Sequence, residues 1–113
     1  MTQVVRIEQP GGPEQMKLVQ VDVGEPGPNE VQVRHHAIGL NYIDIYQRSG
    51  LYSLPLPLTL GMEGAGVVEA IGRDVHHLAL GDRVAYASQP PGSYSELRNL
   101  PATSVCQLPD AID

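Results

Sequence analysis

The chain has 113 residues, 42% of them apolar, which is enough for one domain with a modest buried core. Acidic residues outnumber basic residues by 13 to 7, and the net charge of −6 argues against a nucleic-acid-binding protein, which would carry a clustered basic surplus. The single cysteine, Cys106, excludes an internal disulfide and a cluster of thiolate metal ligands.

No segment contains the roughly 20 consecutive apolar residues that a membrane span requires. Residues 1–6 alternate in polarity and lack the long apolar segment of a signal peptide, so they are better explained as a first strand. We therefore expect a cytoplasmic protein without a membrane partner.

Short strands and turns account for the first forty residues. Residues 4–7 form a strand that ends in a Pro-Gly-Gly-Pro turn at 10–13. Residues 16–23 alternate between apolar and polar side chains, and a loop rich in glycine and proline follows at 24–29. The alternation is clearest at 30–40, where it predicts a half-buried antiparallel strand.

One short helix is expected at residues 41–49. Asn41 is suited to cap its start, Asp44 places an acidic group in the first turn, and Gly50 can adopt the left-handed conformation that ends a helix. Residues 51–60 contain two prolines and are predicted to be an irregular loop.

The second half of the chain again favours strands, which we expect at 66–71, 83–87, 94–100 and 103–108. This pattern predicts a mainly β fold, a partly open β-barrel with one short helix near 42–49. Residues 109–111 resemble the cap and first turn of a helix, but the chain stops at Asp113, too soon for a stable helix. We therefore expect the chain to be part of a longer protein or to be completed by a partner.

A glycine-rich segment at 61–66 is a poor candidate for a nucleotide-phosphate site. Glu69 stands where the dinucleotide fingerprint needs its third glycine, and the next residues favour a strand instead of a helix. We expect these glycines to permit close backbone packing.

The sequence predicts no metal site. His35 and His36 are neighbours on a strand and should point to opposite faces, while the His76–His77 pair lies in a polar turn and is expected to be solvated. Met62 is a poor zinc ligand without a thiolate beside it. Cys106 lies in an apolar strand and is predicted to be an inert core thiol.

The most distinctive segment runs from Asn41 to Tyr52. Tyr42 and Tyr46 are four residues apart, so their rings share one helix face, and Asn41 and Asp44 are expected near that face. Phenols and an amide at a helix end could orient a planar polar ligand. An equally good explanation is a half-buried helix whose tyrosine hydroxyls stay in water. Glu63 is more easily explained as a structural hydrogen-bonding group than as a buried acid.

Five motifs occur in order along the chain: GGPE at 11–14, AIGLNYID at 37–44, RSGLY at 48–52, GMEGAGVV at 61–68 and GDRV at 81–84. In this combination the chain resembles the zinc-free quinone oxidoreductases, the ζ-crystallin-like branch of the medium-chain dehydrogenase/reductase superfamily. Asn41 and Met62 stand where the zinc-dependent alcohol dehydrogenases have a cysteine and a histidine ligand. Their cysteine-rich lobe is missing between Tyr86 and Ser95.

The resemblance implies that residues 1–113 are the GroES-like catalytic domain of a two-domain enzyme. In that family a Rossmann domain, absent from this chain, follows and binds NADPH, which passes a hydride to a quinone. By position in the motif, the residues that resemble the nicotinamide-contacting part are Asn41, Tyr42, Ile43, Asp44 and Tyr46. Tyr52 resembles the quinone-side tyrosine, and Tyr52 and Asn41 would meet the charge on the quinone oxygens without zinc.

Without the Rossmann domain, we expect the isolated chain to bind NADPH weakly or not at all and to show no turnover. The barrel face that would meet this domain should expose apolar surface, so we expect dimers or larger species at high concentration. Two alternatives remain open. One is a non-enzymatic GroES-like assembly module, and the other is a zinc-free enoyl reductase domain.

Overall fold

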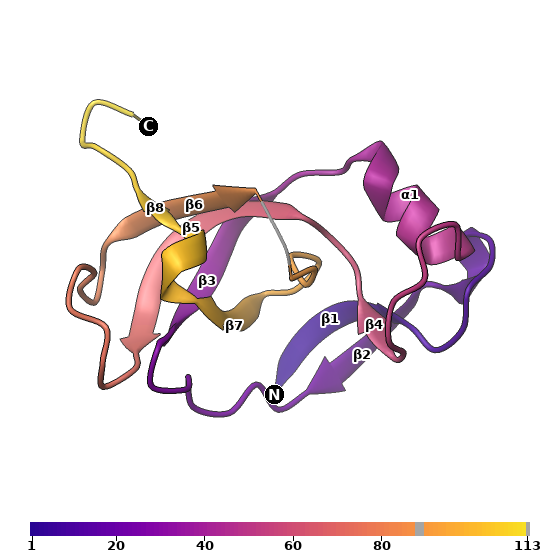
Figure 1. Cartoon of the computed structure of the whole chain (residues 1–113), viewed down its shortest axis with the longest axis horizontal. Coiled ribbons are helices and arrows are strands. Elements are labelled where there is room, and N and C mark those ends of the chain that lie inside the picture. Colours follow the sequence, from indigo (N-terminus) through magenta and orange to yellow (C-terminus); the bar gives the residue numbers. More distant parts are fainter. Residues whose placement is uncertain (88–89, 113) are drawn as a thin grey trace.

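The structure, a computed structural model that describes residues 1–87 and 90–112, consists of two antiparallel sheets and one α-helix (Figure 1). The strand order is β2-β1-β4 in the smaller sheet and β7-β3-β5-β6-β8 in the larger one. The strands are β1 (Thr2–Ile7), β2 (Lys17–Val21), β3 (Glu30–Ile38), β4 (Leu58–Thr59), β5 (Glu63–Ile71), β6 (Arg83–Ala87), β7 (Leu97–Pro101) and β8 (Cys106–Gln107). The two sheets do not close into one barrel, which confirms the predicted mainly β, partly open architecture.

The larger sheet carries the main hydrophobic core. β3 lies between β5 and β7, and its side chains alternate as the sequence predicts, with Val31 and Val33 buried between more exposed neighbours. Val68, Val84 and Leu100 on the adjacent strands complete this layer. A register shift after residue 35 interrupts the alternation, so the last part of β3 is exposed.

The smaller sheet covers a second, smaller core built from Ile7, Leu60 and Tyr94. β4 pairs with the end of β1 inside the segment predicted as an irregular loop, and the prediction is wrong at these two residues. The prolines of that segment precede Leu58, so the backbone N–H groups from Leu58 onward can pair with the free edge of β1.

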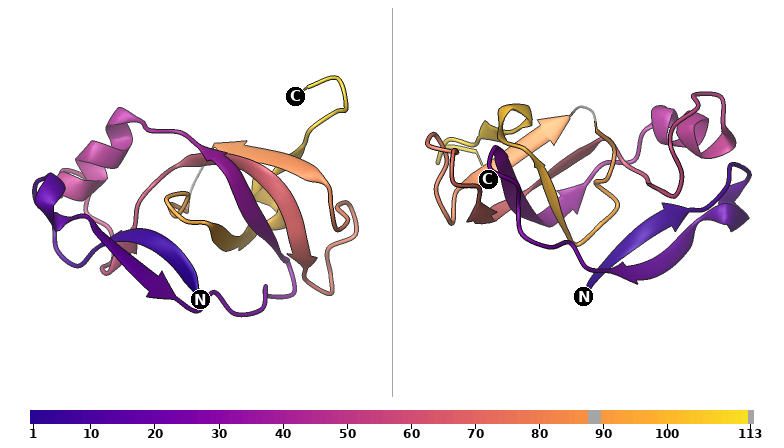
Figure 2. Two further views of the ribbon diagram at one scale, coloured as in Figure 1. Left: turned by 180° about the vertical axis from the view of Figure 1, so that it is seen from behind. Right: turned by 60° about the horizontal axis from the view of Figure 1, so that its bottom comes forward.

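The helix α1 (Tyr42–Ser49) forms where the sequence predicts it. The Asp44 carboxylate accepts the Asn41 backbone N–H at 3.0 Å and so caps the first turn. Gly50 ends the helix with φ of 88°, in the left-handed region that a residue with a side chain avoids. Figure 2 shows α1 and the C-terminal segment at opposite ends of the molecule.

Several strand boundaries differ from the prediction, and the largest differences lie in the second half of the chain. β5 begins at Glu63, three residues earlier than expected, and β7 begins at Leu97 because the Tyr94 N–H pairs with Leu60 O at 2.9 Å instead of continuing the sheet. Of the predicted strand at 103–108, only β8 forms, after a 3₁₀ turn at Ala102–Ser104. The predicted helix start near 109 is a single turn, closed by the Ile112 N–H on Pro109 O at 3.0 Å.

Cys106 is exposed, so the prediction of a core thiol is wrong. The short strand β8 pairs only with β6, and the inward position next to it is taken by Val105, which is buried. Because neighbouring residues of an extended chain point to opposite sides, burying Val105 places Cys106 outside. Within the described ranges, no helix is long and apolar enough to cross a membrane.

Candidate active site

An aromatic corner, defined as Asn41, Tyr42, Tyr46 and Tyr52, lies at the exposed side of α1. Tyr42 and Tyr46 are both exposed, in agreement with the prediction from their spacing that they share one face of the helix. The rings of Tyr46 and Tyr52 meet edge to face with centroids 5.9 Å apart. The backbone fixes this pair, because the Tyr52 N–H donates to Tyr46 O at 3.4 Å just after the helix ends. Tyr46 and Tyr52 are therefore held together by a ring contact and a backbone hydrogen bond.

Asp44 does not share the exposed face of the corner, contrary to the expectation from spacing. Its side chain is only 2% exposed, and its Oδ2 accepts the hydroxyl of Tyr94 at 2.7 Å. Burial raises the pKa of Tyr94 well above its usual range, and the hydrogen bond to Asp44 adds to that effect. Asp44 thus anchors α1 to the small core, and it positions the corner from beneath.

A second contact holds the inner side of α1. Gln47 is buried, and its amide donates to Met62 Sδ at 3.6 Å, which ties the helix to the loop before β5. Ile43 and Asn41 are half-buried beside the start of the helix. The side chains that face inward therefore fix the helix, and those that face outward remain available to a ligand or partner.

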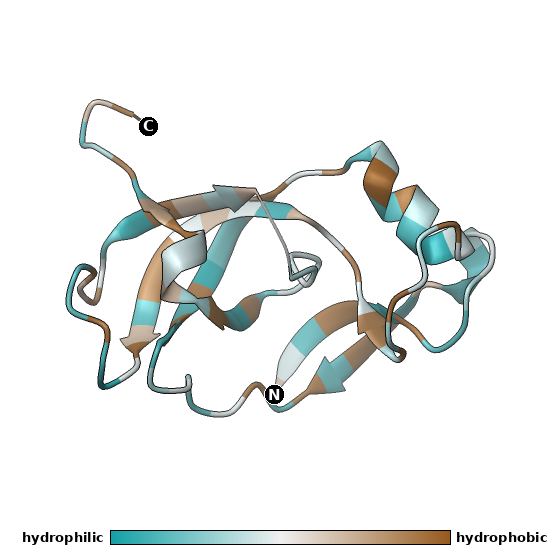
Figure 3. Cartoon of the chain, viewed as in Figure 1, coloured by the Kyte–Doolittle hydropathy of each residue, from teal (hydrophilic) through white to brown (hydrophobic). Residues whose placement is uncertain are grey.

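Exposed apolar side chains concentrate around this corner. Eight of the thirteen large hydrophobic residues that are exposed in the described chain lie between residues 38 and 56, namely Ile38, Leu40, Tyr42, Ile45, Tyr46, Leu51, Tyr52 and Leu56. Figure 3 shows hydrophobic segments on α1 and on the loop beside it. A concentration of this kind marks an interaction or ligand-binding surface in most soluble proteins.

A cavity of about 320 Å³ lies between the ends of β3, β5 and β6, with Gly39, Glu63 and Tyr86 in its wall. His35 Nδ1 lies 2.8 Å from Ser95 O and its Nε2 lies 2.6 Å from the Tyr86 hydroxyl. A carbonyl oxygen can only accept, so Nδ1 carries the proton and the Tyr86 hydroxyl donates to Nε2. Burial lowers the pKa of His35 and raises the pKa of Tyr86.

Sequence reasoning missed this His35–Tyr86 pair. The signal was present, because the alternation that buries Val31 and Val33 puts His35 on the same face of β3, and Tyr86 follows the buried Val84 on β6 in the same way. Two polar side chains on the inward faces of neighbouring strands would be expected to bond to each other.

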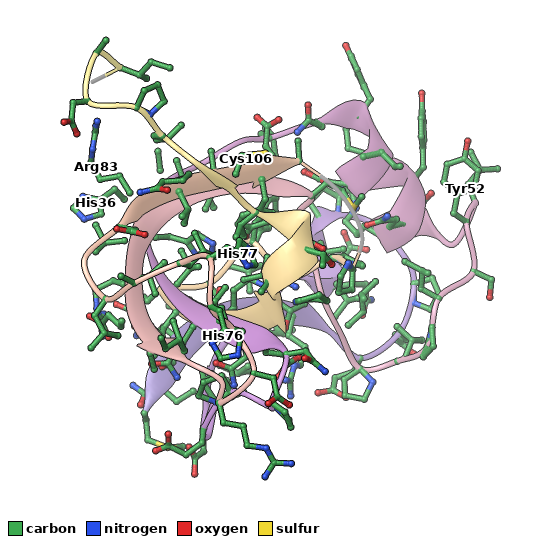
Figure 4. All side chains as sticks on the ribbon, turned by 60° about the vertical axis from the view of Figure 1, so that its left-hand side comes forward. His36, Tyr52, His76, His77, Arg83 and Cys106 are labelled. Atoms are coloured by element: carbon green, nitrogen blue, oxygen red, sulfur yellow. The ribbon has the colours of Figure 1, made fainter. Side chains whose placement is uncertain are left out.

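The remaining histidines lie away from the corner. His76 and His77 are exposed, as predicted, and His36 is exposed as well. Figure 4 shows Tyr52 on the opposite side of the molecule from His36. Among the residues that the structure describes, no group of three or more His, Cys, Asp or Glu side chains could hold a metal ion.

The glycines of the 61–66 segment have the packing role that the sequence predicts. A Cβ atom on Gly66 would lie 2.0 Å from Arg34 O on the paired strand β3, so any side chain there would displace the backbone. At Gly61, a Cβ atom would lie 2.1 Å from the Ser93 hydroxyl. These positions need glycine because two backbone segments approach each other closely.

Comparison with known proteins shows the family to which the chain belongs. Residues 27–110 match the family model of the alcohol dehydrogenase GroES-like domain. The chain is 56% identical over 104 residues to a quinone oxidoreductase of Pseudomonas aeruginosa, a match that covers 91% of this chain and 32% of the relative. It is 37% identical over 118 residues to a 2-haloacrylate reductase of a Burkholderia species, which covers 100% of this chain and 35% of the relative.

The fold agrees with these matches. The crystal structure of Escherichia coli quinone oxidoreductase complexed with NADPH superimposes with a TM-score of 0.95 at 44% identity, over 100% of this chain and 35% of that one. The chain thus spans about a third of the length of the relatives it matches. It belongs to the alcohol dehydrogenase GroES-like domain family, and it corresponds to the N-terminal third of quinone oxidoreductases.

Proposed function

We propose that this chain is the substrate-side catalytic domain of a zinc-independent NADPH:quinone oxidoreductase, whose Rossmann domain lies outside the chain. The observation that carries the proposal is the aromatic corner, which is anchored from beneath by Asp44 and Gln47 and yet exposes its tyrosines. The similarity to quinone oxidoreductases, one of them crystallised with NADPH, supports the same assignment.

The corner fits the nicotinamide end of NADPH in its chemistry. A nicotinamide is a planar ring with a carboxamide, and α1 offers exposed aromatic rings together with the amide of Asn41. The residues that would hold this end of the cofactor are Asn41, Tyr42, Ile43 and Tyr46. Asp44 would hold α1 in position and would not contact the cofactor itself, because its carboxylate is hydrogen-bonded inside the fold. The bound cofactor would supply a hydride, and the domain would position the acceptor beside it.

The protein groups proposed for the chemistry are the Tyr52 hydroxyl and the Asn41 amide. When a quinone accepts a hydride and a proton to become a hydroquinone, negative charge develops on its oxygens. Donors that lie beside these oxygens lower the energy of that charged state. Tyr52 is exposed and Asn41 is half-buried, and they come after and before α1 in the chain.

Zinc independence rests on the donor atoms at the corner. Asn41 offers an amide, and the sulfur of Met62 already accepts a hydrogen bond from Gln47. Neither supplies the thiolate or imidazole that zinc prefers, and the single cysteine lies on β8. We therefore assign polarisation of the substrate carbonyl to hydrogen-bond donors.

A second substrate class is favoured by one observation, the 37% identity to a 2-haloacrylate reductase over the whole chain. In such an alkene the hydride adds to one carbon of the double bond, a proton adds to the other, and the conjugated carbonyl or carboxyl oxygen gains charge in between. The same donors would stabilise that charge. Quinone and conjugated alkene therefore differ in the shape of the acceptor, and only substrate assays separate them.

The test is a chimera in which this chain replaces the matching segment of the Pseudomonas aeruginosa relative. We expect it to oxidise NADPH in the presence of benzoquinone faster than in the presence of 2-chloroacrylate, and to keep this activity after treatment with a metal chelator. Tyr52→Phe should lower kcat/KM for the quinone about 10- to 100-fold, the effect of losing one hydrogen bond to a charged group. The control is Arg73→Gln in an exposed turn.

Full activity of Tyr52→Phe would contradict the role of that hydroxyl. Loss of activity with the chelator would contradict zinc independence, and a preference for the haloacrylate would favour the second substrate class.

The isolated chain is expected to bind NADPH weakly and to show no turnover, because two-thirds of the length of its relatives is missing from it. Fluorescence titration with NADPH checks this, and micromolar affinity would contradict it.

We also expect the exposed apolar residues near the corner to cause dimerisation at high concentration. Light scattering should then show a mass that grows with concentration. A constant monomer would contradict the expected dimerisation, and a closed ring would favour the assembly module over the catalytic domain.

A further inference from the structure

Two arginines lie within strands and are withdrawn from solvent, Arg98 almost completely and Arg6 in part. On β7, Arg98 shares the inward face with Leu100, which is fully buried. On β1, Arg6 shares a face with the buried Thr2 and Val4, since residues two apart in a strand point the same way. The two strands belong to different sheets, and both arginines line the same cavity.

The charge of Arg98 is buried without a counter-ion. The side chain is 8% exposed, and its guanidinium lies 5.3 Å from the ring centroid of Tyr86. It donates to Pro90 O at 3.1 Å and to the Tyr86 hydroxyl at 3.5 Å. Within residues 1–87 and 90–112, no carboxylate lies within 4.0 Å of it. A buried cation held only by neutral groups is costly unless an anion pairs with it.

Arg6 also has a polar group that lacks a hydrogen-bond partner among the described residues. Its Nε is buried and has no acceptor in the described part of the chain. Both arginines line one cavity of about 300 Å³ between the sheets, with Thr59 in its wall. Asp22 also lines it, but its Oδ1 accepts the Gly24 N–H at 3.0 Å and it forms no ion pair with either arginine in the described chain.

We propose that this cavity binds an oxyanion, the carboxylate or phosphate group of a small molecule, between the guanidinium groups of Arg6 and Arg98. Guanidinium groups offer paired N–H donors whose spacing matches both kinds of group. Arg98 has five N–H donors, of which two are used by the described residues, and the buried Nε of Arg6 has no acceptor among them. In a chain of net charge −6, two inward arginines at one cavity create a local positive site.

This site is independent of the reductase proposal, because neither arginine belongs to the aromatic corner. It can be present in a protein without quinone reductase activity, and it can be absent from one that has it.

The test uses the 113-residue chain, titrated with inorganic phosphate and separately with citrate at constant ionic strength, with chloride as the reference anion. Binding is followed by calorimetry and by the NMR signal of the Arg6 Nε–H group. We expect at least one of the two anions to bind and to shift that signal. Arg6→Gln should weaken binding about tenfold or more, as expected for the loss of a charged hydrogen-bond donor. The control, Arg73→Gln, removes an exposed arginine with the same charge change and should leave the affinity unchanged.

Binding of phosphate alone or of citrate alone supports the site and identifies the group it takes. If Arg98→Gln does not fold, Arg98→Lys keeps the charge but loses the paired donors, and should bind the anion more weakly than the unchanged chain. The proposal is overturned if neither anion binds more tightly than chloride, or if Arg6→Gln and Arg73→Gln change the affinity equally.

Discussion

The five tyrosines divide the molecule into two regions. Tyr86 and Tyr94 lie inside the fold, where their hydroxyls bond to His35 and Asp44. The other three, Tyr42, Tyr46 and Tyr52, are exposed on the aromatic corner. Because the residue type is the same, the difference in burial comes from where each tyrosine lies in the fold. In the sheets the tyrosine hydroxyls bond to buried polar groups, whereas the rings of the corner are left exposed.

The corner depends on the sheet region for its order. Asp44 bonds to Tyr94 and Gln47 bonds to Met62, so the inner side of α1 is fixed to the core while its outer side stays uncovered. An isolated eight-residue helix would be unstable in water. The comparison therefore predicts that changes in the sheet region alter stability, and that changes on the outer side of the corner alter binding.

The largest expected effect is in the main core. Leu100→Ala removes a side chain that is 1% exposed, and the resulting cavity should lower the free energy of unfolding by about 2–5 kcal/mol. Leu80→Ala makes the same chemical change at a side chain that is 65% exposed, and should change stability by about 0.5 kcal/mol or less. Urea unfolding measures both. Equal losses in the two variants would contradict the assignment of the core.

A smaller effect is expected where the two regions meet. Tyr94→Phe removes the hydroxyl that donates to Asp44 and leaves a buried carboxylate oxygen without that partner, which should cost about 1–3 kcal/mol. Tyr42→Phe removes the same hydroxyl from a ring that is 77% exposed, and should leave stability nearly unchanged. Thermal unfolding compares the pair. A Tyr94→Phe protein as stable as the Tyr42→Phe protein would show that α1 is not anchored through this bond.

The smallest expected effect is a dependence of stability on pH. Burial lowers the pKa of His35 in the folded protein, so the unfolded chain takes up a proton at a higher pH than the folded one. Stability from this group is therefore complete above the unfolded pKa of about 6.5 and is lost as the pH falls below it. The slope cannot exceed about 1.4 kcal/mol per pH unit for one proton.

His36 provides the matched control for this pH effect, since it is the next residue and is exposed. Urea unfolding between pH 5 and pH 8 should show a shallower pH dependence for His35→Gln than for His36→Gln. The role given to His35 fails if the two variants follow the same pH profile.

The sequence predicted the parts of the fold that depend on local pattern. The strand at 83–87 and the helix with its Gly50 stop form as expected, because alternation and capping are properties of neighbouring residues. β4 was missed because a two-residue strand has no periodicity and forms only where the edge of β1 is available. The burial of Cys106 was mispredicted because a β-strand pattern does not say which face is inside.

At the candidate site, too, the sequence predicted only what depends on neighbouring residues. Spacing correctly put Tyr42 and Tyr46 on one face of α1, but it could not show that Asp44 turns away from them toward Tyr94, fifty residues later in the chain. The cavity between Arg6 and Arg98 depends on two strands from different sheets. Contacts of this kind come from tertiary packing, which no local window contains.

The central claim, that the aromatic corner forms half of a nucleotide-dependent reduction pocket, is tested most directly by fluorine NMR. The five tyrosines of this chain, carried in the chimera with the Pseudomonas aeruginosa relative, are labelled as 3-fluorotyrosine and assigned by single Tyr→Phe variants. On addition of NADPH, we predict that the signals of Tyr42 and Tyr46 shift and that Tyr52 follows when a hydroquinone is added, while Tyr86 and Tyr94 stay in place. Shifts limited to Tyr86 and Tyr94, or no shift at any of the five, would contradict the account.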